Sequence, residues 1–374
     1  MARTGGRDRI VPAQRGSDAT ARNHLEVADD KAVLLFRRCA RPRRRCSGGR
    51  SRRAWRADEG RPRHTEAMRA PVPTPALRHP VRPGQVGAPR AVPASIARPP
   101  YLATGGVPQT RRLEPVRSTE AVARLRRAGH AARRVLDTVV AAVAPGVTTD
   151  HLDAVAHHAY LDEGGYPSTL GYRGFPKSLC TSVHEVVAHG IPDDRPLRIG
   201  EIVNCDVTIY LDGMHGDCSR TVVVGDPAAA DPATVELVAV TAAALALGVA
   251  AVRPGGMLRD VGRAIQDHAE ANGADIVRQL VGHGIGEQFH GDPNVHHYDE
   301  PRNRTRLRPG MAFTIEPMLT AGLPEVALWD DGWTIATMDG LPSAQFEHTV
   351  LVTDDGVEVM TALDGDPLYA VPDR

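Results

Sequence analysis

The second half of the globular sequence repeats the order of the first, and this repetition limits the folds available to the chain. VAPG at 143–146 recurs as VRPG at 252–255, each before a helical pattern, and His189-Gly190 recurs as His283-Gly284. LRIGEIVNCDV then recurs as LRPGMAFTIEP. In the last pair Asp206 falls on Glu316, which makes four matches in one order. Pro-Gly pairs are common, but four ordered matches argue against chance, and repeats set architecture. We predict an α/β (α+β) fold in which two pseudo-symmetric helix-helix-strand halves surround a central antiparallel sheet.

Helical periodicity places two helices in each half. Ser118 can cap a helix in which apolar residues recur at three-four spacing up to Val139, and Pro145-Gly146 ends it. Further helices are expected at about 149–163, 232–252 and 258–271, each stopped by Gly or Pro-Gly. Strands and loops are expected between the helix pairs.

A β-hairpin is predicted over residues 200–225, GEIVNCDVTIYLDGMHGDCSRTVVVG. Two runs rich in Ile, Val, Thr and Tyr flank Asp212-Gly213, a dipeptide that suits a tight type I′ turn. Such a turn fixes the register, because it makes Leu211 face Met214 across the two strands. Every other cross-strand pair follows from that one.

Two aspartates of this hairpin fall on one face. In the predicted register Thr208 faces Asp217, and Asp206 lies diagonally across, roughly 7–8 Å away at the backbone. Two carboxylates this close on an apolar hairpin are costly unless a positive charge lies between them. A metal ion is one interpretation. The other is that both aspartates lie on a solvated face, and the hairpin alone leaves both open.

The second half adds three candidate metal ligands. They are His283 in the Gly-rich GHGIGEQFH, Glu316 in FTIEP and Glu347 in AQFEHTVLV. Buried strands rarely carry Glu without a partner. Four carboxylates and one imidazole suit two divalent cations such as Co, Mn, Fe or Zn, with coordination positions left open as in a catalytic site.

The remaining histidines are interpreted by their context. His189 and His290 are candidate site residues, because each lies in a segment that repeats or flanks the ligand set, and a neutral His can donate to a developing oxyanion. The others are expected to be solvated on helices (His151, His157, His158 and His268) or locally hydrogen-bonded (His184, His296 and His297).

Charge divides the chain although its formal net charge is zero. Residues 1–67 hold 17 Arg and one Lys against eight acidic residues, and the remainder is acidic. We interpret 1–67 as a basic low-complexity segment that is disordered or not natively translated, with Met68 as a candidate start; a nucleic-acid or ribosome-binding arm is the alternative. Residues 68–112 are a Pro-rich extension or linker, and 113–374 form the globular domain.

Neither a membrane span nor a disulfide framework is expected. No apolar run approaches the ~20 residues that a span needs, and no apolar segment follows a basic N-terminus as in a secretory signal. Five Cys in 374 residues are too few for a disulfide scaffold. A reducing, cytoplasmic location is expected.

From about residue 114 to 362 the chain closely resembles type I methionine aminopeptidase. The matching stretches are KSLCTSVHEVVAHGIP, GEIVNCDVTIYLDGMHGDCS, GHGIGEQFH, FTIEPM, DDGWT and AQFEHTVLV. The resemblance implies the pita-bread fold and a catalytic domain over 113–374. It implies removal of the N-terminal methionine from nascent proteins by dimetal-assisted hydrolysis of the first peptide bond, favouring small second residues.

The resemblance also assigns roles to the candidate residues. It makes Asp217 and Glu347 the ligands that bridge two divalent ions, and it implies that Glu316 also assists proton transfer. His290 would stabilise the tetrahedral intermediate, and His189 would contact the substrate amide. The full ligand set that it implies is Asp206, Asp217, His283, Glu316 and Glu347.

A compact apolar pocket for the methionine side chain is implied in the same way. Its matching positions are Thr169, Tyr172, Phe175, Cys180, Phe289 and Trp333, although ordinary core packing is the alternative for the last two. The chain departs from the family at positions that remove no ligand: the family usually has Asn at His184, often Cys at Ala188, Ile at Cys205 and Thr at Cys218.

Two alternatives stand beside this interpretation. A proline-specific peptidase of the same fold would share the carboxylate set, but such enzymes usually carry a folded N-terminal domain, which residues 1–112 cannot make. A metal-free, ribosome-associated binding protein on this scaffold is the second, and the presence of all five ligands argues against it. The expected partners are the N-termini of nascent polypeptides and, as a further candidate, the ribosome; a monomer away from membranes is expected.

Overall fold

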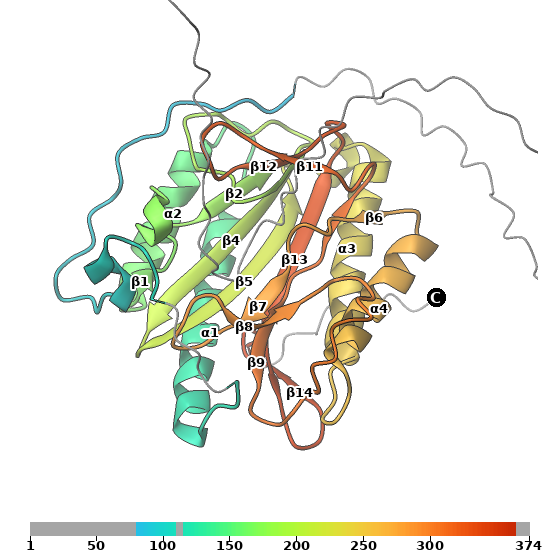
Figure 1. The fold of residues 1–374 in the computed structure, drawn as a ribbon. Helices are drawn as coiled ribbons and strands as arrows, with labels where there is room; N and C mark the ends of the chain where they lie inside the picture. The colour runs from blue at the N-terminus through green and yellow to red at the C-terminus, as the bar shows by residue number, and fades with distance from the viewer. Residues whose placement is uncertain (1–79, 110–114, 364–374) are drawn as a thin grey trace, which may run out of the picture. The chain divides into compact units, whose positions relative to one another are not determined.

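The computed structural model describes residues 80–109 and 115–363, and its centre is one large antiparallel sheet (Figure 1). A small second sheet joins β11 (Val326–Leu328), β12 (Ile335–Thr337) and β3 (Val186–Ala188). The main path of the large sheet is β1 (Tyr166–Pro167), β4 (Ile202–Leu211), β5 (Met214–Val223), β13 (Ser343–Val352), β9 (Ala312–Ile315), β7 (Gly282–Gly284) and β8 (Gly291–Val295). Short strands join its sides: β2 (Cys180–Val183) on β4, β10 (Met318–Thr320) and β14 (Val357–Val359) on β13, and β6 (Asp275–Ile276) on β10.

Two pairs of helices cover one side of this sheet (Figure 1). The helix α1 (Thr119–Ala141) packs on β4 and β5, and α2 (Thr149–Asp162) packs on α1. In the second half, α3 (Pro232–Ala250) packs on β13, and α4 (Leu258–Ala271) packs on α3. Short 3-10 turns span Pro100–Thr104 (η1), Tyr172–Gly174 (η2) and Pro227–Ala229 (η3). The Ser118 hydroxyl accepts from the Ala121 amide, as expected of an N-cap. The predicted fold class is confirmed.

The internal repeat is visible in the hydrogen bonds of the backbone. The Gly146 amide, after the first helix, donates to the Leu197 carbonyl over 2.7 Å. At the equivalent place in the second half, the Gly255 amide donates to the Leu307 carbonyl over 2.8 Å. The strands β5 and β13, one from each half, pair at the centre of the sheet. The two halves therefore meet along that pair of strands.

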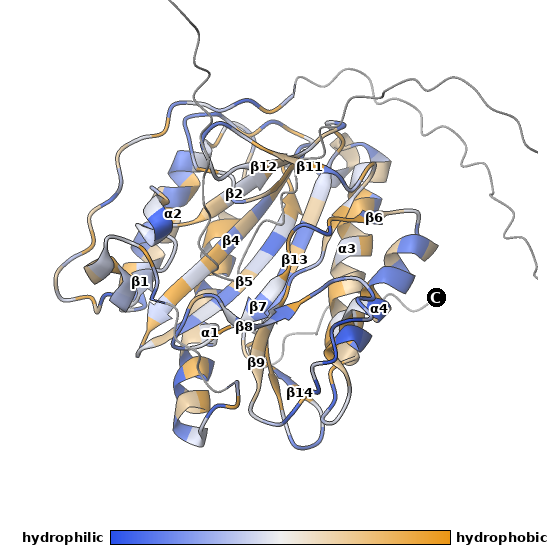
Figure 2. Ribbon diagram, viewed as in Figure 1, coloured by the Kyte–Doolittle hydropathy of each residue, from blue (hydrophilic) through white to orange (hydrophobic). Residues whose placement is uncertain are grey.

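Each half has its own hydrophobic core between its helices and the sheet. The first core contains Leu125 and Leu136 of α1 against Val207 of β4, and the second contains Leu245 of α3 against Phe313 of β9. Figure 2 shows α3 as apolar along most of its length, whereas α4 carries both polar and apolar residues. The cores leave the β5–β13 seam as the place where polar side chains of both halves can meet.

The expectation that no segment has the length and apolar composition of a membrane span was wrong for one helix. Among the described residues, α3 is long and apolar enough to cross a membrane. Its Leu237, Ala244 and Leu245 side chains are buried, and the helix packs against α4 and β13. Of the apolar window, 44% is buried inside the protein, and its buried residues belong to the hydrophobic core of the second half.

The hairpin forms in the predicted register. Leu211 pairs with Met214, Thr208 with Asp217 and Asp206 with Ser219. Asp212 and Gly213 have φ of 52° and 78°, the left-handed values that a type I′ turn requires at both central positions. The turn dipeptide therefore specifies where every side chain of β4 and β5 points.

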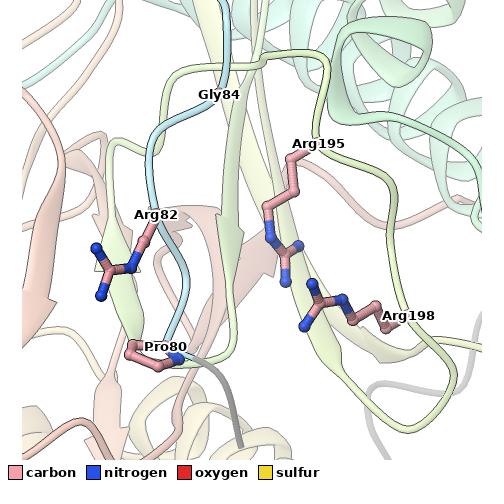
Figure 3. A pocket seen from close by; sticks show the side chains of 5 residues that line it. All are labelled: Pro80, Arg82, Gly84, Arg195 and Arg198. Carbon is pink, nitrogen blue, oxygen red and sulfur yellow. The ribbon is translucent and has the colours of Figure 1, made fainter.

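Residues 80–109 form an extended segment, which we call the strap, along the catalytic domain (Figure 1). Arg90 holds it, donating to the Asp150 carboxylate over 2.9 Å and to the Asp153 carboxylate over 3.0 Å. Near Pro80 the strap and the loop that carries Arg195 line a cavity of about 490 Å³ (Figure 3). The predicted segment 1–67 and the start of the 68–112 extension lie outside the described residues.

Candidate metal centre and active site

Five strands from both halves bring the predicted ligands together. Asp206 lies on β4, Asp217 on β5, His283 on β7 and Glu347 on β13, and Glu316 directly follows β9. These strands are neighbours in the sheet. The ligand atoms of Asp217, His283 and Glu347 lie within 4.8 Å of one another. His283 Nε2 is 3.7 Å from Asp217 Oδ2 and 3.7 Å from Glu316 Oε1.

Strand pairing explains why Glu347 belongs to this group. On β13, Glu347 lies opposite Ser219 of β5, and the next residue, His348, lies opposite Ile315 of β9. Glu347 is thus held between the aspartates of the first half and Glu316 of the second. Since the register of both pairs is fixed by buried neighbours, the carboxylate cannot shift without moving the seam.

The repeated His-Gly segments depend on glycine for a close approach of backbones. A Cβ on Gly284 would lie 1.9 Å from the Asp292 carbonyl oxygen, and one on Gly190 would lie 2.1 Å from the Thr181 carbonyl oxygen. Real Cβ atoms do not approach oxygen so closely. Each glycine lets the chain pass a neighbouring segment tightly, and the residue before Gly284, His283, lies beside the carboxylates.

Burial raises the pKa of every carboxyl group in the cluster. The pKa of Asp206 is raised to about 7 and that of Glu316 to about 8, with burial as the largest cause. The pKa values of Asp217 and Glu347 are raised well above the ordinary value by burial and then by the neighbouring carboxylates. Burial lowers the pKa of His283 to about 4, so its imidazole is neutral near pH 7.

The protein supplies hydrogen bonds to this cluster but no cation. Thr208 Oγ1 donates to Asp217 over 2.8 Å, and Thr314 Oγ1 donates to Glu316 over 2.7 Å. In the part of the chain that the structure describes, no Lys or Arg forms an ion pair with the four carboxylates. Buried acids in this number need external positive charge. The donor set therefore fits divalent metal ions.

A backbone carbonyl group orients the His283 ring. Its Nδ1 lies 3.2 Å from the Gly284 carbonyl oxygen, so Nδ1 carries the proton and donates. Nε2, which faces Asp217 and Glu316, then has a free lone pair. This is the tautomer that a metal-ligating histidine needs.

The two other candidate histidines flank the cluster. The His290 ring lies 4.3 Å from the His283 ring, and its Nδ1 is 2.9 Å from the Tyr172 hydroxyl. His189 has a left-handed φ of 57°, and its ring meets Trp333 edge-on at 6.1 Å. Burial lowers the pKa of His189 to about 4 and that of His290 well below its usual range. Both side chains are neutral near pH 7.

Aromatic side chains gather beside these histidines. The Tyr172 and Phe289 rings are 4.9 Å apart, and Phe175 meets Trp333 edge-on at 5.2 Å. The Thr169 hydroxyl donates to the Lys177 carbonyl, so its methyl group points away from that carbonyl. Cys180 is buried on β2 directly opposite Asp206. The six predicted pocket residues thus lie on the segments 169–180, 289 and 333 that surround the cluster.

The sequence interpretation missed two residues in contact with this region, and it expected a third, His297, only to be locally hydrogen-bonded. His215 stacks on Phe289 at 5.3 Å, His297 Nε2 accepts from the Glu316 amide at 3.1 Å, and Tyr101 of the strap packs on Tyr172. His215 could have been found, because the hairpin register places it on the same face as Asp217. Tyr101 carries no sequence signal.

The predictions for the other histidines were correct in some cases and wrong in others. His151 and His158 are exposed as expected. His157 was wrongly expected to be solvated: it is buried and bonded to Ser178 Oγ at 2.8 Å and to the Ala91 carbonyl of the strap at 3.0 Å. His184 has a φ of 56°, a left-handed conformation that Asn tolerates well, which gives a reason for the usual Asn there.

Clustered acids and a neutral histidine that converge on an antiparallel sheet define a candidate metal centre. The chain belongs to metallopeptidase family M24, which matches residues 123–354. It is 48% identical to methionine aminopeptidase 2 of Mycobacterium tuberculosis over 75% of this chain and 97% of that protein. It is 51% identical to methionine aminopeptidase A of Synechocystis over 65% of this chain and 96% of that one. Within the family it thus belongs with the methionine aminopeptidases, hydrolases that remove N-terminal methionine.

Solved structures agree with this placement. The crystal structure of methionine aminopeptidase from Rickettsia prowazekii matches with a TM-score of 0.64 and 44% identity, over 66% of this chain and 99% of that one. This chain therefore has the pita-bread fold that the resemblance implies. Prolidase from Pyrococcus furiosus matches with a TM-score of 0.53 at 21% identity, which shows a shared fold alone.

Proposed function

We propose that this enzyme removes methionine from the N-termini of nascent proteins in the cytoplasm, acting as a monomer with two divalent ions and favouring small second residues. One observation carries the proposal: buried acids of both halves converge with a neutral histidine beside an aromatic pocket. The ions would be held by Asp206, Asp217, His283, Glu316 and Glu347. Such ions supply Lewis acidity and lower the pKa of bound water.

Proton transfer is assigned to Glu316. Its carboxyl group already receives hydrogen bonds from Thr314 and Gln345, which fix its position. A carboxylate that is held in one orientation can act as a general base and then return the proton as a general acid. Glu316 would accept the proton of the attacking water and pass it to the departing amine.

The neutral histidines are assigned to the substrate. His290 uses Nδ1 toward the Tyr172 hydroxyl, which leaves Nε2 to donate to the carbonyl oxygen of the first peptide bond as negative charge develops. His189 would donate to the substrate amide. Because both rings stay neutral, each keeps one nitrogen as a donor without adding repulsion to nearby cations.

The aromatic residues beside the cluster suit a methionine side chain. Thioethers make favourable contacts with aromatic rings and adapt to irregular gaps. Tyr172, Phe289 and Trp333 form one buried or half-buried cluster. A pocket of rings with few polar groups would reject charged first residues, because their desolvation would go uncompensated.

Hydrolysis by metal-stripped protein, re-supplied with Mn, Fe, Co or Zn in turn, tests the proposal. We expect metal-dependent release of methionine from Met-Ala-Ser, lost in Asp206→Ala, and little turnover of Ala-Pro. Turnover of Xaa-Pro peptides in preference would indicate a proline-specific peptidase. Inactivity on both substrates with every metal would overturn the enzymatic proposal and favour a binding role on this scaffold.

The ribosome is proposed as a partner because the substrate is expected there. The basic segment 1–67 is the candidate contact and lies outside the described residues. Co-sedimentation of full-length protein with ribosomes, compared with a chain that starts at Met68, would test it. Equal sedimentation of the two proteins would contradict a role for that segment.

A further inference from the structure

We propose that Tyr101, which the strap contributes, is a positioning residue of the methionine pocket and acts through Tyr172. The inference rests on the proposed function, since it concerns the pocket of that same site. Tyr101 lies outside the segment that matches family M24. This role makes the strap a part of the pocket that selects methionine, and not only a linker.

Contacts hold the Tyr101 ring in one place. It is 5% exposed, its hydroxyl donates to the Ser168 carbonyl over 2.5 Å, and its ring meets that of Tyr172 edge-on at 5.0 Å with an interplanar angle of 85°. Edge-to-face pairs of this kind are favourable beyond their buried area. The Tyr172 hydroxyl in turn reaches His290 Nδ1. The ring of Tyr101 is therefore one residue removed from a proposed substrate-side histidine.

The backbone of the strap is locked to the same loop. The Gly106 amide donates to the Tyr101 carbonyl over 2.9 Å, and the Arg173 amide donates to the Gly106 carbonyl over 2.8 Å. A Cβ on Gly106 would lie 2.1 Å from the Gly171 carbonyl oxygen. Only a glycine permits this approach, so the turn at 100–106 is seated against the loop that carries Tyr172.

Tyr101 also has a second aromatic neighbour beside the pocket. Its ring stacks on His215 at 6.1 Å, and His215 stacks on Phe289 at 5.3 Å with 12° between the planes. One strap side chain thus braces Tyr172 directly and Phe289 through His215. Without it, both rings would gain freedom that a bound methionine side chain must then remove, which weakens binding.

Steady-state kinetics on the full chain with saturating Mn tests this. For Tyr101→Ala we expect KM for Met-Ala-Ser to rise roughly 3- to 10-fold, the range that loss of an aromatic pair implies. The preference for Met-Ala-Ser over Leu-Ala-Ser should fall by a similar factor. Tyr101→Phe keeps the ring, so it should restore KM to within about twofold. In a Tyr172→Ala background the effect of Tyr101→Ala should shrink to the part that runs through His215 and Phe289, because Tyr172 is the main route.

Val92→Ala is the matched control. Val92 is a buried strap residue that packs on Tyr166 and Leu170 instead of the pocket aromatics. It should lower thermal stability without changing substrate preference. Wild-type KM and preference in Tyr101→Ala would overturn the inference, as would an undiminished effect in the Tyr172→Ala background. If Tyr101→Ala fails to fold, Tyr101→Leu, which fills the space without a ring edge, should show the same loss of preference.

Calorimetric binding of L-methionine separates this inference from the proposed function. An enzyme that binds methionine but releases none from peptides would contradict the proposed hydrolysis, while weaker methionine binding by Tyr101→Ala would still support the positioning role. Equal methionine affinity in wild type and Tyr101→Ala would overturn that role even where hydrolysis proceeds.

Discussion

At the scale of single residues, four clustered carboxyl groups destabilise the metal-free protein; Asp217 and Glu347 are buried, and Asp206 and Glu316 are half-buried. Asp217 is held among three other acids and 3.7 Å from His283, with the Thr208 hydroxyl as its donor. Such a site favours the binding of a cation, but it lowers the stability of the metal-free protein. Mutations of the cluster should therefore affect folding and activity in opposite directions.

Asp217→Asn is the clearest case. We expect hydrolysis to fall by more than ~100-fold, since one of the five proposed metal ligands is lost, while the metal-free protein gains about 1–3 kcal/mol of stability because a buried acid is removed. Thermal unfolding in chelator, beside peptide hydrolysis in Mn, measures both. Asp267→Asn, an exposed acid of α4, should change neither. A metal-free Asp217→Asn protein less stable than wild type would contradict the argument.

Stability should depend on pH in opposite ways with and without metal. The folded, metal-free protein has the pKa of Asp206 near 7 and of Glu316 near 8. Between the ordinary carboxyl pKa and these values it binds more protons than the unfolded chain, so its stability should fall as pH rises from about 5 to 8. With excess Mn, protons compete with the metal, so stability should rise over that window. Urea unfolding across pH 5–8 tests this; parallel curves would refute it.

Much of the site could be predicted at this scale because a turn dipeptide sets a register. Asp212-Gly213 fixed which side chains of the hairpin share a face, and the structure has that register. Tyr101 could not be predicted, since its role depends on a loop that meets the strap only in three dimensions. His157 was misjudged because the strap covers a helix face that periodicity leaves open.

At the scale of elements, the short strand β7 owes its position to the absence of a side chain. Gly284→Ala would place a Cβ 1.9 Å from the Asp292 carbonyl oxygen, so β7 and β8 must separate. We expect a loss of about 1–3 kcal/mol in unfolding free energy and weaker metal binding as His283 moves. Gly356→Ala, where nothing lies within 4 Å, is the control and should be neutral. Unchanged metal affinity in Gly284→Ala would contradict this.

The elements themselves were well predicted where local signals are strong. The structure begins α1 after Ser118 and gives α4 as Leu258–Ala271, the predicted bounds. The end of α3 was placed two residues late, at 252 instead of Ala250. Its apolar composition was not recognised as that of a helix in the hydrophobic core of the second half, which depends on packing that periodicity does not report.

At the scale of the whole molecule, charged contacts are among those that join the strap to the rest of the described chain. Arg90 reaches both Asp150 and the buried Asp153. Arg90→Ala would leave Asp153 with backbone donors alone, so we expect a loss of about 1–2 kcal/mol and faster hydrogen exchange over residues 92–106. Arg82→Ala, at an exposed strap residue, is the control. Unaltered exchange in Arg90→Ala would show that other contacts hold the strap.

The repeat in the sequence predicted the architecture of the whole molecule, because each half folds by the same local rules. It could not predict how the strap packs. A Pro-rich segment has no periodicity to reveal a buried face, and its contacts come from residues far along the chain. The relative from Mycobacterium tuberculosis aligns with 75% of this chain, more than residues 115–374 can supply, so part of the strap has a counterpart there.

The ligand set spans the chain from Asp206 to Glu347, and this has a consequence for the order of events in the cell. During synthesis the strap leaves the ribosome before any surface that it packs against exists. The last ligand appears only when β13 has been made and can pair with β5 and β9. A newly synthesised molecule therefore cannot remove methionine from any protein until nearly all of its own chain has been translated. Each newborn molecule depends on older copies, or on another aminopeptidase, for any trimming of its own first residue before that point.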